Sequence, residues 1–147
     1  MICLGNICRS PLAEGIMKNK IAQHGLNWTV DSAGTGSWHV GEKPDQRSAA
    51  VAQKYGIDIN NQRARQLRAD DLQEFDLIFA MDSSNYQNII SMANSPAEEG
   101  KIHLIMNVVK PDYNQNVPDP YFDNDGFEQV FQMLDEACEH IIEKFTK

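Results

Sequence analysis

Residues 3 to 11 read Cys-Leu-Gly-Asn-Ile-Cys-Arg-Ser-Pro, and this stretch constrains the fold more than any other. Five residues separate Cys3 from Arg9, and a helical pattern begins immediately afterwards. The glycine and asparagine between them tolerate the backbone conformations of a tight turn, and Ser-Pro is typical of a helix start. A loop this short directs successive backbone N–H groups at one point. The stretch therefore predicts an anion-binding loop that closes onto a helix.

Two side chains of this loop indicate its chemistry. The Arg9 guanidinium offers a planar fork of donors that suits an oxyanion with several oxygens. The same positive field would stabilise the thiolate of Cys3 at the mouth of the loop. A lone Cys-x5-Arg pattern is weak, because an isolated cysteine is more often a small buried hydrophobe. With the turn residues and the helix start in place, the pattern favours a nucleophile at the base of a phosphate-sized cradle.

The composition predicts one globular domain over residues 1–147, with 41% hydrophobic and 23% charged residues. Three cysteines, an odd number, argue against a disulfide scaffold and favour a reducing compartment, with the cytoplasm as the default. The net charge of −8 argues against nucleic acid or an anionic membrane as a partner. No apolar run approaches the roughly 20 residues that span a membrane. The four histidines and three cysteines show no metal-ligand spacing, so no metal or cofactor is expected.

Helical and apolar patterns alternate along the chain. Helices are expected over 10–23, 45–55, 69–75 and 126–145, and from a cap at Ser83 or Ser84 to residue 92. Strands are expected over 28–30, 77–81 and 101–106. Polar or irregular segments are expected over 35–44, 57–67 and 107–121. This order predicts an α/β fold with an open, mostly parallel four-stranded sheet and helices on both faces. Cys3, Ser32, Asp82 and Asp119 all follow strand candidates, so we expect them to converge on one edge of the sheet.

The loop from Cys3 to Pro11 closely resembles the signature loop of the low-molecular-weight protein tyrosine phosphatases. The resemblance continues through Asp-Ser-Ala-Gly-Thr at 31–35, Ala-Met-Asp-Ser-Ser-Asn at 80–85 and Pro-Asp-Pro-Tyr at 118–121, and so covers nearly the whole chain. It implies a phosphotyrosine protein phosphatase I-like fold and hydrolysis of phosphotyrosine and small aryl phosphates through a phosphocysteine intermediate. The implied partners are phosphotyrosine-containing proteins, and the resemblance implies that the protein is a monomer by default.

The resemblance assigns roles to the catalytic residues. Cys3 is the nucleophile, and Arg9 binds the phosphate together with the rest of the loop: Leu4, Gly5, Asn6, Ile7, Cys8 and Ser10. Asp119 is the general acid that protonates the leaving group and the base that then activates water. Its flanking prolines restrict the backbone and hold it extended, which distinguishes it from a solvated surface carboxylate. Ser10 donates to the Cys3 thiolate, and a helix-cap role is compatible with that.

Other residues match supporting positions of the family. Trp38 and Tyr121 are expected as aromatic walls that favour aryl over alkyl phosphates, since both lie in polar loops. Asn6 is expected to adopt a positive φ with Ser32 as one partner. Gln62 replaces a common histidine partner, so the support of the loop differs here and is expected to be weaker. Asp82 matches a supporting carboxylate, and a purely structural role remains an alternative.

The remaining cysteines have less certain roles. The resemblance suggests a reversible Cys3–Cys8 disulfide that protects the nucleophile from over-oxidation, whereas a buried hydrophobe is the alternative for Cys8. Cys138 has core-like spacing and is expected to be inert. Phe122 stands where many relatives carry a second tyrosine, so regulation by phosphorylation of that hydroxyl is unavailable.

Three other functions remain open. Arsenate reductases of this fold add redox cysteines near residues 70 to 90, and this chain has none there. Protein arginine phosphatases typically carry threonine at the position of Ile7, so the apolar residue favours the tyrosine-directed branch. A phosphate-binding or redox-sensing module without turnover is the alternative from another class, although Cys3, Arg9 and Asp119 are all intact.

The chain departs from its relatives at the first strand. Relatives place several apolar residues before the signature cysteine, and here only Met1 and Ile2 precede it. Without a full central strand, residues 28–30 and 77–81 would lack a shared neighbour. A shortened chain or start site, a sheet that closes with a gap, and repair by a second chain are three possible accounts. We expect reduced stability and a greater tendency to self-associate or exchange strands.

Overall fold

A parallel four-stranded sheet with the order β2-β1-β3-β4 organises the molecule. The computed structural model describes residues 1–122 and 125–146. The strands are β1 (Ile2–Cys3), β2 (Ala33–Gly34), β3 (Ile78–Ala80) and β4 (Ile102–Leu104). The predicted α/β class, strand number and parallel pairing are therefore confirmed.

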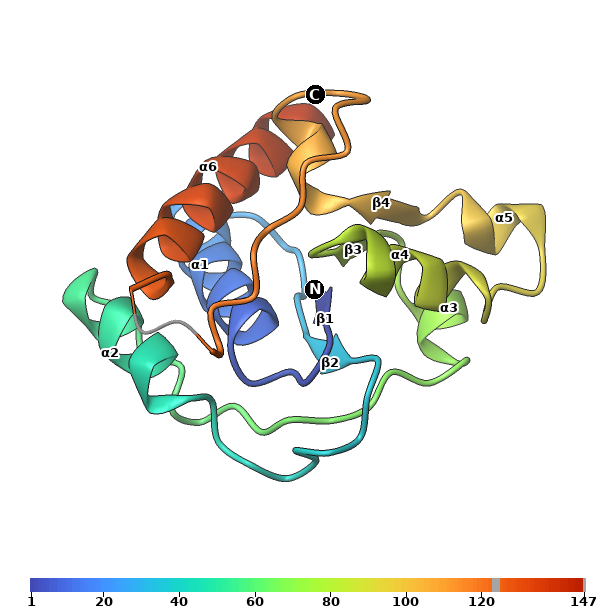
Figure 1. Cartoon of the computed structure of the whole chain (residues 1–147). Helices are drawn as coiled ribbons and strands as arrows, with labels where there is room; N and C mark the ends of the chain where they lie inside the picture. The colour runs from blue at the N-terminus through green and yellow to red at the C-terminus, as the bar shows by residue number, and fades with distance from the viewer. Residues whose placement is uncertain (123–124, 147) are drawn as a thin grey trace.

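Helices cover both faces of this sheet (Figure 1). One layer contains α1 (Arg9–Gln23), α2 (Gln46–Lys54) and α6 (Phe127–Phe145). The other contains α3 (Asp71–Glu74) and α4 (Ser83–Ile90), with α5 (Pro96–Glu99) beyond the β4 edge and a 3-10 turn η1 (Ile105–Val108) after β4. None of the helices in the described part of the chain is long and apolar enough to cross a membrane.

Each helix layer buries its own apolar cluster against the sheet. Between α1, α6 and one face lie Leu12, Ile16, Leu134 and Ile141, all at most 2% exposed. The opposite cluster joins Ile78 of β3 to Ile89 of α4. Because parallel strands are covered on both faces, apolar residues run continuously along β3, as the sequence pattern indicated.

The short first strand lies in the middle of the sheet. Ile2 pairs with Ala33 on one side and with Ala80 on the other, and Cys3 pairs with Gly34. Two residues therefore join the halves of the sheet and place the loop of residues 3–11 at the carboxyl ends of the strands, where ligands bind in such sheets.

Two local predictions were wrong. Residues 28–30 are not a strand, because β2 begins only at Ala33, where Met1 provides a backbone partner: Ala33 N–H donates to the Met1 carbonyl at 3.1 Å. The cap of α4 is Asp82, rather than Ser83 or Ser84. Its carboxylate accepts from the Asn85 N–H at 2.8 Å and so satisfies a free donor of the first turn.

Candidate active site

Asn6 holds the loop in shape from inside. Its φ is 58°, which confirms the expected positive value, and its side chain is only 3% exposed. The amide nitrogen donates to the hydroxyls of Ser10 at 2.7 Å and Ser32 at 3.0 Å, and the amide oxygen accepts from the Arg65 N–H at 3.0 Å. One side chain thus ties the loop to α1, to the segment before β2 and to residues 57–67.

The Cys3 thiol lies at the base of this loop. It is 3% exposed, 3.0 Å from the Ser10 hydroxyl, and accepts from the Asn6 N–H at 3.3 Å. Gly34 allows β2 to pack closely, since a side-chain carbon there would lie 2.7 Å from the Leu4 carbonyl oxygen. Donors that converge on a sulfur stabilise its anionic form, so the geometry suits a thiolate nucleophile.

Arg9 is positioned by two segments far away in the sequence. Its Nη1 donates to the Asp82 carboxylate at 2.6 Å and to the Val117 carbonyl at 3.0 Å, and the side chain is 2% exposed. Because a buried guanidinium is costly without partners, the carboxylate and the carbonyl fix its plane as well as its charge. Arg9 is also the first residue of α1, directly after the loop.

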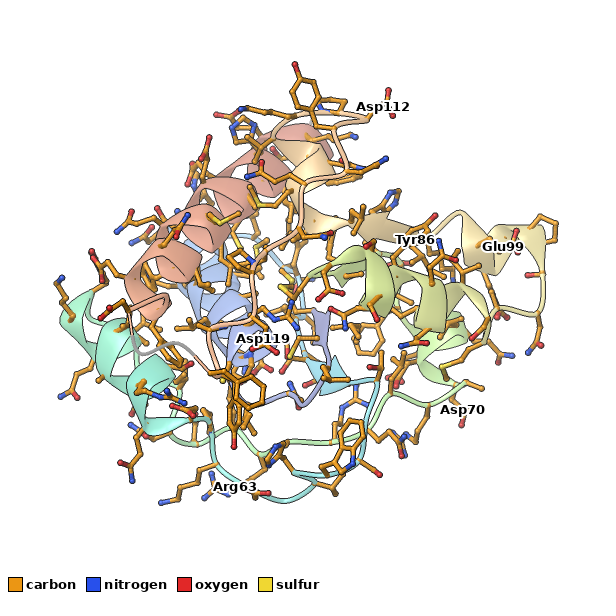
Figure 2. All side chains as sticks on the ribbon, in the orientation of Figure 1. Arg63, Asp70, Tyr86, Glu99, Asp112 and Asp119 are labelled. Carbon is orange, nitrogen blue, oxygen red and sulfur yellow. The ribbon has the colours of Figure 1, made fainter. Side chains whose placement is uncertain are left out.

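Asp119 lies beside the same guanidinium, over the start of α1 (Figure 2). Its Oδ2 is 3.7 Å from Arg9 Nη2, whereas its Oδ1 accepts from the Tyr121 N–H at 3.1 Å. The Val117 N–H donates to the Met81 carbonyl at 2.8 Å, which anchors the segment to the end of β3. Ser32, Asp82 and Asp119 are therefore brought to the loop that carries Cys3 and Arg9, which agrees with the predicted convergence of Cys3, Ser32, Asp82 and Asp119 on one edge of the sheet.

Glu14 supports the site and was missed in the sequence analysis. This carboxylate is 4% exposed and accepts from the Ser32 hydroxyl at 2.6 Å and from Lys18 at 2.6 Å. Ser32 is thereby oriented toward Asn6. The available signal was the spacing, because Glu14 follows Ser10 by four residues and so lies on the same face of α1.

The support from residues 62–65 differs from the expected one. Gln62 donates to the Pro11 carbonyl at 3.1 Å, and the second partner of Asn6 is the main-chain N–H of Arg65. The Arg65 guanidinium pairs with Asp31 at 3.1 Å and with Asp71 at 2.9 Å, which holds this segment in place. A main-chain donor carries no sequence signal, so this partner was not predictable.

Aromatic rings border the entrance to the loop. Tyr121 is 37% exposed, and its ring centroid lies 6.1 Å from that of His39. His39 also contacts Glu42 at 2.9 Å and packs against Gly5, where a side-chain carbon would lie 3.0 Å from its ring. Trp38 is 72% exposed and folds over Gly36. The site therefore has a histidine at its border that the sequence analysis assigned no role.

Two neighbours of the site differ in exposure. Cys8 is buried at the cap position of α1, and burial, followed by the charge of Asp45, raises the pKa of its thiol to about 12. Both loop cysteines are free thiols.

Phe122 is 92% exposed, and its ring meets the Tyr121 ring edge-to-face with 4.9 Å between the ring centroids. Among the described residues, no group of three or more His, Cys, Asp or Glu is placed to hold a metal ion.

Comparisons with known proteins place this site in a family. The model of the low molecular weight phosphotyrosine protein phosphatase family matches residues 1–147. A protein of Synechocystis, named for the low molecular weight protein-tyrosine-phosphatases, is 42% identical over 149 residues, which cover 99% of this chain and 94% of that protein.

Solved structures agree with that match. A protein tyrosine phosphatase from Entamoeba histolytica with Hepes in its active site has a TM-score of 0.92 and 37% identity, covering 99% of this chain and 94% of the other. A Drosophila arginine phosphatase has a TM-score of 0.92 and 34% identity, covering 99% and 96%. The chain belongs to the family of low molecular weight phosphotyrosine protein phosphatases and is a phosphoric monoester hydrolase.

Proposed function

We propose that this chain hydrolyses phosphotyrosine in proteins, and small aryl phosphates, through a phosphocysteine intermediate on Cys3. The observation that carries the proposal is the position of Arg9. Its guanidinium lies between the end of the loop and the Asp119 carboxylate, with 3.7 Å between Nη2 and Oδ2. A nucleophile, an anion-binding fork and a carboxyl group therefore meet at one point, as an in-line phosphoryl transfer requires.

The first step forms the Cys3 Sγ–phosphorus bond and breaks the bond between phosphorus and the tyrosine oxygen. Arg9 and the loop N–H groups bind the equatorial oxygens, where charge is concentrated in the transition state. Asp119, protonated at this stage, gives its proton to the leaving phenolate oxygen. The Ser10 hydroxyl, 3.0 Å from Sγ, stabilises the thiolate before attack.

The second step reverses these roles. Water attacks phosphorus, Asp119 accepts its proton, and the sulfur–phosphorus bond breaks to release inorganic phosphate and the Cys3 thiolate. The hydrogen bond from Ser10 now stabilises the departing sulfur. The backbone N–H of Tyr121 orients Asp119 through its other carboxylate oxygen, which keeps Oδ2 toward the loop.

The depth of Cys3 in the site and the aromatic rings at the entrance favour an aryl phosphate as the substrate. Cys3 is 3% exposed at the base of the loop, so a phosphate must be carried inward on a long side chain. Tyr121 stacks on the phenyl ring, and we assign Trp38 the outer, solvent-facing side of the same wall. The free cysteines are consistent with a reducing compartment, and we place the reaction in the cytoplasm.

Arginine phosphatase activity is the second candidate, because one of the similar solved structures is that of a Drosophila arginine phosphatase. Ile7 is 8% exposed and packs with Cys8, Ala64 and Phe127, so its apolar side chain belongs to a small core cluster. A loop position occupied by an apolar residue offers no hydroxyl to the substrate. We therefore assign tyrosine rather than arginine specificity.

The test compares phosphotyrosine, phosphoarginine and phosphoserine peptides without added metal. We expect hydrolysis of the phosphotyrosine peptide, at least about a thousandfold loss in Cys3→Ser, and a loss of about a hundredfold or more in kcat for Asp119→Asn.

Two matched controls accompany these variants. Cys138→Ser changes a cysteine in the core of α6, and Asp112→Asn changes an aspartate in the same polar segment as Asp119, at a positive φ of 66° that asparagine also accepts. Both should retain activity. Faster hydrolysis of the phosphoarginine peptide, or activity that survives Cys3→Ser, would overturn the proposal.

A further inference from the structure

The backbone of Tyr121 connects the side chain of Asp119 with α2. Its N–H donates to Asp119 Oδ1 at 3.1 Å, and its carbonyl oxygen accepts from Arg47 Nη2 at 3.0 Å. These two hydrogen bonds hold the peptide groups on either side of the Tyr121 Cα. The direction of the Asp119 carboxylate therefore depends on an arginine of α2.

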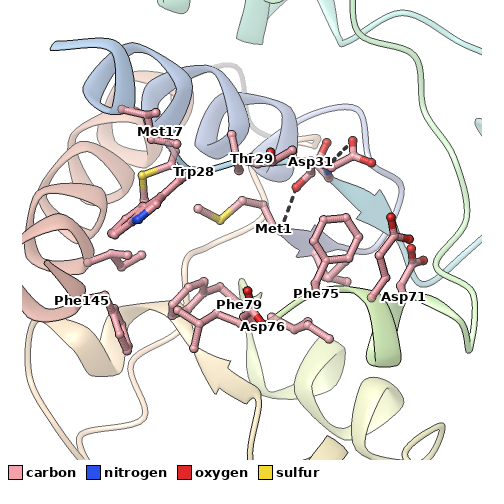
Figure 3. A pocket seen from close by; sticks show the side chains of 18 of the residues that line it. Met1, Met17, Trp28, Thr29, Asp31, Asp71, Phe75, Asp76, Phe79 and Phe145 are labelled. Atoms are coloured by element: carbon pink, nitrogen blue, oxygen red, sulfur yellow. Dashed lines mark hydrogen bonds between the residues drawn. The ribbon is translucent and has the colours of Figure 1, made fainter. Parts of the chain in front are cut away.

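Packing alone does not fix Tyr121, because its side chain borders a cavity of about 650 Å³ beside the active site. The cavity lies between residues 39–46 and α2, and Ile7 of the loop is part of its lining. The larger cavity in Figure 3, of about 750 Å³, lies at the amino ends of the strands and shares no lining residue with it among those described. A polar contact, rather than a packed core, thus holds the Tyr121 backbone on this side.

Arg47 is itself fixed by Asp45, the N-cap of α2. Its Nε and Nη2 donate to the two oxygens of the Asp45 carboxylate at 3.0 and 2.9 Å, and its backbone N–H donates to the same carboxylate at 2.9 Å. The hydrogen bond from the guanidinium lowers the pKa of Asp45, although burial opposes this shift, so the pair is ionic at neutral pH. A fork that binds two oxygens has a defined plane, and the direction of Nη2 is therefore defined as well.

The same pair is attached to the loop of residues 3–11. The Asp45 N–H donates to the Ile7 carbonyl at 2.8 Å. The Arg47 guanidinium also packs against the ring of Phe127, 4.6 Å from its centroid, and this buried ring lies in one apolar cluster with Ile7. Asp45 and Arg47 thus link the loop that would bind the phosphate with the segment that carries Asp119.

We propose that Arg47 is a positioning residue for Asp119, which it keeps within reach of the leaving oxygen by fixing the Tyr121 peptide. This inference rests on the proposed function, in which Asp119 protonates the leaving group. Arg9 places a positive charge 3.7 Å from the Asp119 carboxylate, whereas Arg47 sets the direction of that carboxylate. A general acid that is out of place slows each substrate according to how much protonation its leaving group needs.

The test compares two aryl phosphates in the wild type and in Arg47→Met, which keeps an unbranched stem but has no donor. A phenol without a nitro group has a pKa of about 10, so phenolate needs protonation to leave, whereas nitrophenolate needs little. We expect kcat/KM for phenyl phosphate to fall about tenfold or more, and kcat/KM for p-nitrophenyl phosphate to fall at most about threefold. The ratio of the two values does not depend on the fraction of folded protein. Arg47→Lys keeps the charge without the fork, and its ratio should lie between those of the wild type and Arg47→Met.

Arg63→Met is the matched control. Arg63 is exposed and also donates to backbone carbonyls, those of Asn60 at 2.8 Å and Gln62 at 2.7 Å. It lies apart from Asp119 (Figure 2). Both values of kcat/KM should therefore equal those of the wild type.

A second comparison uses Asp119→Asn, which has no proton to donate. If Arg47 acts through Asp119, adding Arg47→Met to this variant should change kcat/KM for phenyl phosphate by less than about twofold. An equal loss for both substrates in Arg47→Met, or the same loss with and without Asp119, would overturn the inference about Arg47. Wild-type kcat/KM for phenyl phosphate in Asp119→Asn would instead overturn the acid role of Asp119 in the proposed function, and this inference with it.

Discussion

The conformation of the active-site loop depends on one residue with a positive φ. Asn6 adopts that conformation at a smaller cost in free energy than most other residues do. Its amide nitrogen donates to the hydroxyls of Ser10 and Ser32, and its amide oxygen accepts from the Arg65 N–H. A buried amide with satisfied donors and acceptor is rigid, so the N–H groups around the phosphate site are aligned before substrate arrives. Gln62 donates to the Pro11 carbonyl, and the Asn6 amide oxygen accepts from the main-chain N–H of Arg65.

A single carboxylate, Asp82, serves two elements at once. One of its oxygens caps α4 through the Asn85 N–H, and the other holds Arg9 at 2.6 Å. Asp82→Asn keeps an oxygen for the cap but removes the charge that orients the guanidinium. We expect kcat/KM for an aryl phosphate to fall about tenfold or more, mainly through KM for the phosphate, with little loss of helix stability.

The control is Asp135→Asn, which removes a half-exposed carboxylate that pairs with Lys20 at 3.1 Å. Steady-state kinetics and inorganic phosphate inhibition should be unchanged there. If Asp82→Asn binds phosphate as tightly as the wild type, the orienting role is wrong.

At the scale of elements, α1 has an unusual buried face. Ser10 and Glu14 are buried on it together with Leu12 and Ile16. The polar pair does not weaken the helix contact, because Ser32 and Lys18 satisfy the Glu14 carboxylate. The helix thus packs against α6 with its apolar residues and holds the segment before β2 with its polar ones.

Glu14→Ala should therefore cost more than the loss of a surface ion pair. It leaves the Ser32 hydroxyl without its acceptor, and we expect the free energy of unfolding to fall by about 1–3 kcal/mol. Lys18→Ala removes the exposed partner of the same carboxylate and should cost at most about 1 kcal/mol. Denaturant unfolding of both variants checks the order, and a larger loss for Lys18→Ala would contradict it.

The Arg65–Asp71 pair gives the fold a dependence on pH. Burial alone would raise the pKa of Asp71, but hydrogen bonds from the Arg65 guanidinium and the Arg68 N–H bring it below its usual value. A carboxylate with a lowered folded pKa stabilises the protein above about pH 3.8, and this contribution is lost as the pH falls through the folded pKa.

Asp71→Asn should therefore reduce stability at pH 7 and flatten the loss of stability in acid. Denaturant unfolding from pH 7 to pH 3 should show a wild-type advantage that shrinks toward the acid end. A difference between the two proteins that is the same at every pH would mean that the ionised carboxylate contributes nothing.

At the scale of the whole molecule, the sequence was informative wherever the signal was local. Apolar periodicity located α1, α2 and α6 to within one residue at each end, and the positions of the strand ends predicted that Cys3, Asp82 and Asp119 lie at the same edge of the sheet. The prediction failed for residues 28–30, because a strand exists only where a neighbour pairs with it, and the β1 that could pair there has two residues.

The groups of the site that were not predicted from the sequence were missed for one physical reason. Glu14, His39 and the Arg65 main chain act on the loop through contacts across the fold, and each depends on how two elements are placed relative to one another. Their residue types alone carry no such information. The role proposed for Asp119 was assigned through its flanking prolines and a family resemblance, and its place beside Arg9 is consistent with that role.

The most direct test of the account is detection of the phosphocysteine intermediate. With p-nitrophenyl phosphate the leaving group needs little protonation, so Asp119→Asn should slow the second step more than the first. Rapid mixing should then release a burst of about one nitrophenolate per enzyme. Mass spectrometry of the quenched protein should find the phosphoryl group on Cys3. Steady hydrolysis without a burst, with Cys3 unmodified, would contradict the mechanism.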